Sequence, residues 1–351
     1  GYYARIKGAL WDVLDVPCLT AETLQEYAER HTVCPFELGL DSSLWSDVII
    51  GDYNYLFDPV VHLVRFFESA GDYIFLVDEA HNLPGRARKM HSAALTKTSF
   101  YEAKKLLGKG KSSLKNALTK VNDVFIEWRH RAEEETAARD GRFGKTFFLK
   151  ERSEEFDHLL NRLCEPLEAW LDDHREPDET HTALLQLYFD VRAWLRVADT
   201  FDDHFVLQIT ASGSEVRAAQ LCLDPSAFLA DSFALGRAAV LFSATLAPAS
   251  YYKDLCGVPE ARAVALRSPF PAGNQGLFCI GNVSTRYKDR DASLAIVEES
   301  LATMVRARCG NYLAFFPSYA YMEQAYAQFK EHCPEINCIK QENAMDEQQK
   351  A

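Results

Sequence analysis

The chain has 351 residues, and 48% of them are hydrophobic, which suits a globular protein with a large core divided over two or three domains. Its formal net charge of −13 disfavours a protein that binds nucleic acid over its whole surface, but it allows a basic groove on an acidic body. No signal peptide is recognisable and no apolar run approaches the roughly 18 residues of a membrane span, so no membrane partner is expected.

The first 40 residues predict two helices followed by a cysteine. Residues 5–16 place apolar side chains at helical spacing, and Thr20 caps a second helix that runs to Ala28. Cys34 then stands before Pro35, where the fixed proline ring can open the backbone around a thiolate metal ligand. A buried free thiol at a turn is the better interpretation of this residue alone. The chain's nine cysteines are scattered without a Cys-x-x-Cys pair, which favours a reducing, cytoplasmic compartment over a disulfide framework.

A strand is predicted next, over residues 46–50, and a cluster of aromatic and amide side chains follows its end. In this cluster Tyr53 and Tyr55 offer rings for stacking and Asn54 offers hydrogen bonds, which is typical of contacts with single-stranded nucleic acid. A tyrosine-rich packed loop explains the same residues equally well. A helix over residues 60–67 would return the chain to the next strand by a right-handed crossover.

The apolar run at residues 73–77 ends in two adjacent carboxylates. It predicts a parallel strand buried on both faces, with Asp78 and Glu79 at its carboxyl end, where open α/β sheets bind ligands. Asp78-Glu79-Ala80-His81 in this setting resembles the second helicase motif of superfamily 2 nucleic-acid motors. In that class Asp78 would hold the Mg²⁺ of MgATP and Glu79 would orient and deprotonate the attacking water. His81 would face the second motor domain and report the nucleotide state. A solvated acidic turn is the alternative.

Residues 94–204 are helical by pattern and rich in lysine, for which a solvated helix face is the simplest explanation. Two short words in this segment, Gly110-Lys111-Ser112 and Gly144-Lys145-Thr146, mimic the end of a phosphate loop. The full pattern needs another glycine at position 105 or 139, and those positions hold Lys105 and Arg139. The 351 residues therefore contain no phosphate loop.

Further strands are predicted over residues 205–209 and 216–223, and an apolar strand that begins at Ala238 ends in Ser243-Ala244-Thr245. Taken alone, the two hydroxyls mark an ordinary strand end. After an upstream Asp-Glu-Ala-His word they resemble the third helicase motif. In that motif Ser243 and Thr245 would link the neighbouring carboxylates to bound nucleic acid by hydrogen bonds.

Prolines near residue 270 predict a linker, after which a second α/β domain opens. Its predicted elements are a strand over residues 276–280, a helix over 292–307 and a strand over 310–319. At the end of the last strand, Ser318 and Tyr319 resemble the fourth helicase motif, whose side chains touch the backbone of the bound strand. An ordinary strand end is again the alternative.

These segments in this order resemble the XPD/DinG-type iron–sulfur DNA helicases, and most of all their bacterial branch. The resemblance implies an α/β fold, with a RecA-like parallel-sheet motor domain, a large helical arch insertion and the start of a second RecA-like domain. Residues 1–40 would be the end of the iron–sulfur insertion, and residues 41–93 with 205–262 would form motor domain 1 in two pieces. Residues 94–204 would be the arch, and residues 263–351 would begin motor domain 2.

The resemblance also implies the chemistry, namely part of an ATP-dependent 5′→3′ DNA helicase of repair or replication. Its cofactors would be ATP, Mg²⁺ and a [4Fe–4S] cluster, and its partner single-stranded or forked DNA. Cys34 matches the fourth cluster ligand, and the other three would precede Gly1, so both ends are expected to be cuts through a longer protein. The chain alone is then expected not to hydrolyse ATP. A helicase-derived binding or scaffold module without ATPase activity is the alternative, whereas a nuclease fusion lacks the carboxylate-rich domain it needs.

Overall fold

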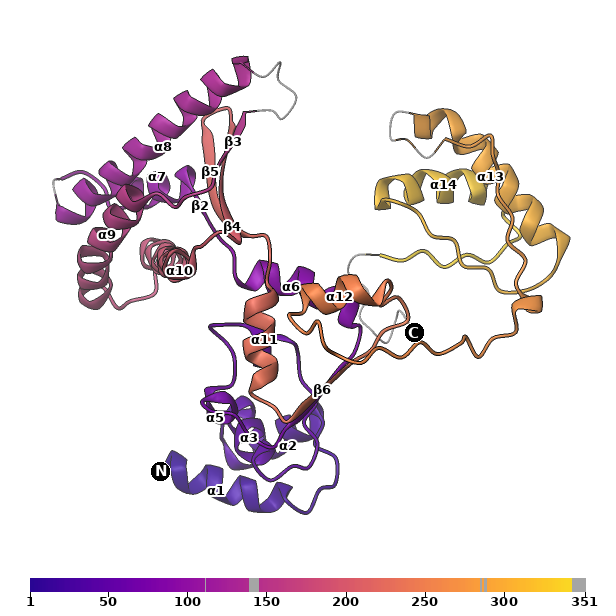
Figure 1. Cartoon of the computed structure of the whole chain (residues 1–351), viewed down its shortest axis with the longest axis horizontal. Coiled ribbons are helices and arrows are strands. Elements are labelled where there is room, and N and C mark those ends of the chain that lie inside the picture. Colours follow the sequence, from indigo (N-terminus) through magenta and orange to yellow (C-terminus); the bar gives the residue numbers. More distant parts are fainter. Residues whose placement is uncertain (111, 139–144, 285, 287–288, 343–351) are drawn as a thin grey trace. The chain divides into compact units, whose positions relative to one another are not determined.

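The computed structural model describes residues 1–110, 112–138, 145–284, 286 and 289–342, and the chain divides into two compact units (Figure 1). The first unit is Gly1–Val264 and the second is Ala265–Ala351, a division close to the one predicted at 262/263. Lys111 and Gly144, one residue from each of the two phosphate-loop mimics, lie outside the described residues. Within the described ranges, none of the helices combines the length and the apolar content that crossing a membrane requires.

Three helices open the first unit and pack around a small core of their own, formed by Ala9, Val13, Ala28 and Leu38. They are α1 (Tyr2–Val13), α2 (Ala21–His31) and α3 (Pro35–Ser43). The predicted cap is confirmed, because the Thr20 hydroxyl accepts a hydrogen bond from the Thr23 amide at 3.2 Å. Pro35 stands at the first position of α3, where its missing N–H costs nothing.

A two-stranded parallel sheet forms the body that carries the acidic motif. Strand β1 (Ile74–Val77) pairs with β6 (Ala238–Leu241), with Ile74 opposite Ala238 and Val77 opposite Leu241. Short helices surround it: α4 (Asn54–Phe57), α5 (Val64–Phe67), the 3₁₀ turn η1 (Ala80–Asn82), α6 (Leu83–Met90), α11 (Ser226–Ala234) and α12 (Ala249–Leu255). The core of this body is Phe57, Val77, Ala80, Leu83, Ala87, Leu229, Phe233 and Cys256. The two strands were predicted correctly, and their register places both carboxyl ends at one edge.

Three predictions about this body are wrong. Residues 46–50 form no strand in the described chain, and Val48 and Ile50 are 76% and 95% exposed. The predicted helix over residues 60–67 shrinks to the single turn of α5. Strand β1 is not buried on both faces, because Ile74 and Leu76 are 63% and 69% exposed. For the two strand predictions the reason is that an apolar run becomes a buried strand only where a hydrogen-bonding neighbour and a covering layer are present.

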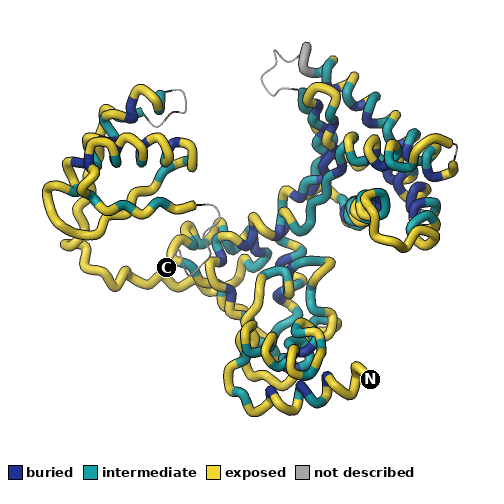
Figure 2. Tube along the Cα trace, turned by 180° about the vertical axis from the view of Figure 1, so that it is seen from behind, coloured by how far each residue is buried: buried dark blue, intermediate teal, exposed yellow. Residues whose placement is uncertain are grey.

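A second body of the first unit combines four helices with an antiparallel sheet. The helices are α7 (Lys97–Leu106), α8 (Ser113–Ala138), α9 (Glu154–Asp173) and α10 (Glu179–Thr200). The strands run in the order β2 (Ala93–Thr96), β5 (Glu215–Cys222), β4 (Phe205–Ser212) and β3 (Thr146–Leu149). Figure 2 shows buried residues gathered in these elements, and the buried rings of Phe125, Phe156 and Trp194 pack edge-to-face in their centre. We call residues 93–222 the antiparallel body.

The antiparallel body corrects one assignment made from the sequence. Residues 94–204 are largely helical, as predicted, but the strands after them do not return to the parallel sheet. Strand β4 pairs with both β3 and β5, and Leu207 and Ile209 join the same buried cluster as the four helices. Alternate residues of β4 are buried because one face of its sheet packs against helices. The predicted boundary at 204/205 therefore cuts through one packed body.

The second unit contains two long helices that pack together, α13 (Arg290–Ala307) and α14 (Tyr319–His332), after the 3₁₀ turn η2 (Ala272–Asn274). Small apolar clusters join them, one of which holds Leu294, Tyr321 and Ala325. The predicted helix over residues 292–307 is confirmed. The strands predicted over 276–280 and 310–319 are wrong for the described part of the unit, where Leu277 and Phe315 are 91% and 86% exposed and no ladder forms.

Candidate functional site

The parallel pairing of β1 and β6 brings together two strand ends, one followed by carboxylates and the other by hydroxyls. After Val77 and Leu241 the ladder continues for one step, since the Phe242 amide donates to the Val77 carbonyl at 3.0 Å. Asp78 and Glu79 follow β1 directly, and Ser243 stands two residues after the end of β6. Side chains from two segments more than 160 residues apart in sequence therefore meet at one edge of the sheet.

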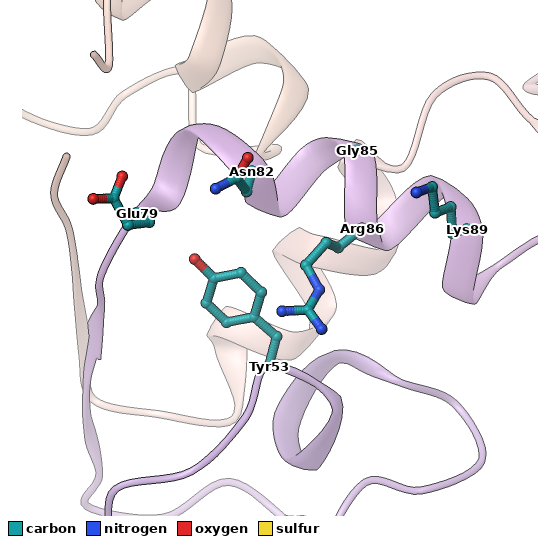
Figure 3. A pocket seen from close by; sticks show the side chains of 6 residues that line it. All are labelled: Tyr53, Glu79, Asn82, Gly85, Arg86 and Lys89. Carbon is teal, nitrogen blue, oxygen red and sulfur yellow. The ribbon is translucent and has the colours of Figure 1, made fainter. Parts of the chain in front are cut away.

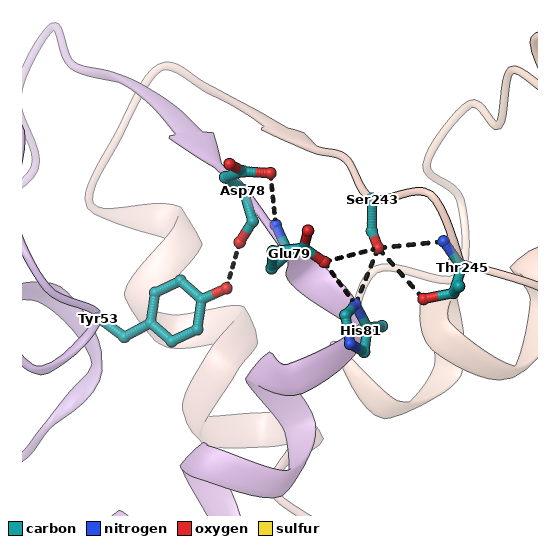
Figure 4. A network of polar contacts seen from close by, with 6 residues as sticks. All are labelled: Tyr53, Asp78, Glu79, His81, Ser243 and Thr245. Atoms are coloured by element: carbon teal, nitrogen blue, oxygen red, sulfur yellow. Dashed lines mark hydrogen bonds and ion pairs between the residues drawn. The ribbon is translucent and has the colours of Figure 1, made fainter. Parts of the chain in front are cut away.

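Four of the predicted residues form one polar network at this edge (Figure 4). The Ser243 hydroxyl lies 2.8 Å from His81 Nδ1 and 3.3 Å from Glu79 Oε2, and His81 Nδ1 lies 3.1 Å from the same carboxylate oxygen. A consistent assignment has His81 Nδ1–H donating to the serine oxygen and the serine hydroxyl donating to Glu79. The Thr245 amide donates to the Ser243 oxygen at 3.2 Å. Ser243 is thus the centre of the network.

Both acidic side chains are exposed, and the Glu79 backbone has an unusual conformation. Asp78 Oδ1 accepts from the Glu79 amide at 2.7 Å, and Glu79 has φ +46° and ψ +39°, the left-handed region that non-glycine residues rarely occupy. Exposed carboxylates suit Mg²⁺, which binds proteins through one or two carboxylates and keeps several waters. No group of three or more His, Cys, Asp or Glu in the described chain is arranged to hold a metal.

A pocket of about 450 Å³ opens beside the acidic pair and is lined by Tyr53, Glu79, Asn82, Gly85, Arg86 and Lys89 (Figure 3). The cations Arg86 and Lys89 stand on α6 and were not predicted as site residues. The sequence does contain a pattern that could have predicted them, because the basic stretch 86–89 follows the acidic motif. The guanidinium of Arg86 lies over the Tyr53 ring, 5.0 Å from its centroid, and 3.4 Å from the Asp52 carboxylate.

Residues 7–100 match the family model DEAD_2, a range that includes both Cys34 and the Asp78–His81 motif. The chain is 24% identical to the general transcription and DNA repair factor IIH helicase subunit XPD of Schizosaccharomyces pombe, over 89% of this chain and 49% of that protein. The resemblance to the XPD-type helicases is confirmed.

Two further relatives agree with this XPD-type assignment. The XPD/RAD3 subunit of Saccharomyces cerevisiae is 22% identical over 91% of this chain and 50% of its own length. The ATP-dependent DNA helicase CHL1 of Coccidioides immitis is 20% identical over 89% of this chain and 40% of its own length. The chain therefore spans about half the length of the curated relatives it matches. The bacterial branch suggested by the sequence stays a prediction.

The remaining residues expected for XPD-type helicases are not members of this side-chain network in the described chain. Asn54 and Tyr55 belong to α4, where Asn54 is half-buried and Tyr55 is exposed. In the second unit, Ser318 caps α14 by accepting from the Tyr321 amide at 3.3 Å, and the Tyr319 ring is half exposed. Tyr53 differs from the expectation most, because its hydroxyl donates to the main-chain carbonyl of Asp78.

Cys34 is an exposed thiol that precedes α3, and it is not the buried thiol that its sequence context alone suggested. A [4Fe–4S] cluster needs four ligands. Within the described residues, Cys34 has no neighbouring set of Cys, His, Asp or Glu that would complete such a site. Cys34 would supply one of the four ligands, and the described residues alone do not form a cluster site.

Proposed function

We propose that this chain is the central part of an ATP-dependent DNA helicase that moves 5′→3′ along a single strand in DNA repair or replication. The observation that supports this most is the network that joins Glu79 to Ser243. It connects a carboxylate pair at the end of one parallel strand to the hydroxyl pair at the end of the next. A solvated acidic turn would need no such connection.

Each residue of the network has a defined task in the proposed mechanism. Asp78 holds the magnesium of MgATP, which neutralises the phosphates on which the reaction occurs. Glu79 orients the attacking water and takes its proton. Ser243 and His81 hold the Glu79 carboxylate through the contacts at 3.3 and 3.1 Å, and Thr245 extends the network toward the bound strand.

The proposal also assigns the other segments. Residues 1–40 would end an iron–sulfur insertion, residues 41–93 and 223–262 would belong to motor domain 1, and the antiparallel body would be the arch. The second unit would begin motor domain 2, in which Ser318 and Tyr319 contact the strand together with Asn54 and Tyr55 of motor domain 1. Forked DNA with a 5′ or a 3′ single-stranded tail, offered in a strand-displacement assay, tests the polarity.

The decisive experiment uses the intact protein, by which we mean the natural gene product that contains this chain. Glu79→Gln should lower DNA-stimulated ATP hydrolysis at least 100-fold while leaving single-strand affinity unchanged, since loss of a general base costs roughly 10²- to 10⁴-fold. Glu68→Gln, at an exposed carboxylate outside the network, is the matched control. Undiminished hydrolysis in Glu79→Gln would refute the proposal.

A binding or scaffold module without ATPase activity is the second candidate. The same assay separates the two functions. An intact protein that binds single-stranded DNA without hydrolysing ATP would support the scaffold. In either case the chain by itself should not hydrolyse ATP, because it lacks the lysine that cradles the β- and γ-phosphates.

A further inference from the structure

Tyr53 makes its contacts with the protein itself. Its hydroxyl donates to the Asp78 carbonyl, Arg86 covers its ring at 5.0 Å, and Phe57 meets it edge-on at 6.2 Å. Phe57 is 4% exposed and packs in turn against Phe233 of α11 at 5.4 Å. A phenol is protonated at neutral pH, so the Tyr53 hydroxyl acts as the donor to the Asp78 carbonyl. The ring is therefore anchored in the core and is poorly placed to stack on a base.

The contact made by Tyr53 completes the fixation of one peptide group. The peptide between Asp78 and Glu79 is held at its carbonyl by the Tyr53 hydroxyl and at its N–H by Asp78 Oδ1, at 2.7 Å. This peptide determines the direction in which the Glu79 backbone continues. Because both of its polar groups are engaged, rotation of the peptide plane would break two hydrogen bonds at once.

The fixation matters because the Glu79 backbone is in a conformation of high energy. A φ of +46° at a glutamate persists only when its surroundings hold it there. In this conformation the side chain lies within reach of Ser243 and His81. If the Asp78 carbonyl were released, the backbone could relax to the β or α region, and the carboxylate would leave the network.

We propose that Tyr53 is a positioning residue, whose hydroxyl keeps Glu79 in the left-handed conformation that points its carboxylate at Ser243. The inference rests on the proposed function, because the positioned group is the one assigned to activate water. It replaces the strand-stacking role that the sequence suggested for Tyr53. Arg86 supports the same role by holding the ring against α6.

The first test removes only the hydroxyl, with Tyr53→Phe in the intact protein. Loss of one hydrogen bond should lower kcat for ATP hydrolysis about 5- to 10-fold, while KM for ATP and the affinity for single-stranded DNA stay within about 2-fold. Tyr101→Phe is the matched control, because Tyr101 is exposed, lies outside the network, and its hydroxyl makes no hydrogen bond within the described part of the chain. Weaker DNA binding with normal kcat at saturating DNA would make Tyr53 a strand contact and overturn the inference, as would an unchanged kcat.

The second test needs no hydrolysis and uses this chain itself. The backbone amide resonance of Glu79 should shift in Tyr53→Phe and stay in place in Tyr101→Phe, because only the first change frees the Asp78 carbonyl. If the intact protein proves to be a scaffold without ATPase activity, the proposed function fails while a shifted Glu79 amide still supports the link from Tyr53. An unmoved Glu79 amide in Tyr53→Phe overturns the inference whatever the intact protein does.

Discussion

Ser243→Ala tests the central contact of the network most directly. The substitution removes the hydroxyl that lies 2.8 Å from His81 and 3.3 Å from Glu79, while the direct contact between these two side chains, at 3.1 Å, remains. A hydrogen bond contributes about 0.5–1.5 kcal/mol net. Since the Glu79 side chain is 59% exposed, water replaces part of the lost contact, and the lower half of that range applies. A loss of about 1 kcal/mol corresponds to a kcat lowered about 5-fold.

The effect should appear in kcat and not in KM for ATP, because Ser243 supports the group that activates water and does not touch the nucleotide in the proposed mechanism. Steady-state hydrolysis by the intact protein at saturating single-stranded DNA measures both constants. Ser243→Thr keeps a hydroxyl at the same position and is the matched control, with an expected kcat close to that of the wild type. A raised KM with unchanged kcat would assign Ser243 to nucleotide binding and refute this reasoning.

A double-mutant cycle with His81→Ala makes the prediction sharper. If Ser243 and His81 both act by holding the one Glu79 oxygen, removal of the second residue should add little once the first is gone. We expect about 5- to 10-fold for the pair, against about 25-fold for independent effects, which is a coupling energy of about 0.5–1 kcal/mol. Full additivity would show that the hydroxyl and the imidazole serve separate purposes, and the network would then be incidental.

Four further predictions concern stability and reactivity. Asp157→Ala should lower the free energy of unfolding by about 1–3 kcal/mol, because the buried Trp194 indole N–H loses its acceptor at 2.8 Å. Asp157→Asn keeps an acceptor and should cost less. Guanidinium unfolding followed by tryptophan fluorescence distinguishes the two variants. Burial raises the pKa of Asp157 in the folded state. The protonated carboxyl should therefore stabilise the wild-type fold below pH 3.8, the pKa in the unfolded chain, and this stabilisation should be lost as pH rises through the folded pKa. Asp157→Asn should lack this pH-dependent loss. Burial raises the pKa of the Cys256 thiol to about 11, so iodoacetamide at neutral pH should modify the exposed Cys34 and spare Cys256, as read by mass spectrometry. Ser318→Ala should remove the cap of α14, at a cost of about 1 kcal/mol, and accelerate amide hydrogen exchange in its first turn.

The meeting of the two motifs could be predicted because it follows from a rule of sheet geometry. Two apolar runs that pair in parallel end at the same edge, so the residues after Val77 and after Leu241 must be neighbours wherever the runs stand in the sequence. The residue types then decided the chemistry, since carboxylates and hydroxyls at such an edge suit magnesium, water and phosphate. Neither step needed the 160 residues that lie between the two strands.

The failed strand predictions share a different property. Residues 46–50, 276–280 and 310–319 have the composition of strands, but a strand exists only through hydrogen bonds to a neighbour, and composition does not identify the neighbour. The role of Tyr53 was missed for a similar reason. Its hydroxyl bonds to a main-chain carbonyl 25 residues later, and a carbonyl leaves no mark in the sequence. Structure predictions that depended on one segment of the sequence were confirmed more often than those that required a second, distant segment as hydrogen-bonding partner.

The limits of the antiparallel body are best fixed by where its ends meet. The chain enters it from α6 through His91 and Ser92 and leaves it through Cys222 into α11. The Cys222 amide donates to the Ser92 hydroxyl at 2.9 Å, and the His91 ring stacks on Phe228 at 3.9 Å. A segment whose two ends are bonded to each other can leave a sheet and return without disturbing it. The helical pattern ends at Thr200, but the two ends of the body meet at Ser92 and Cys222. The strands that follow Thr200 therefore belong to the same inserted body. The boundary of an inserted body therefore lies where the chain closes on itself, and a change of secondary structure within it is not a boundary.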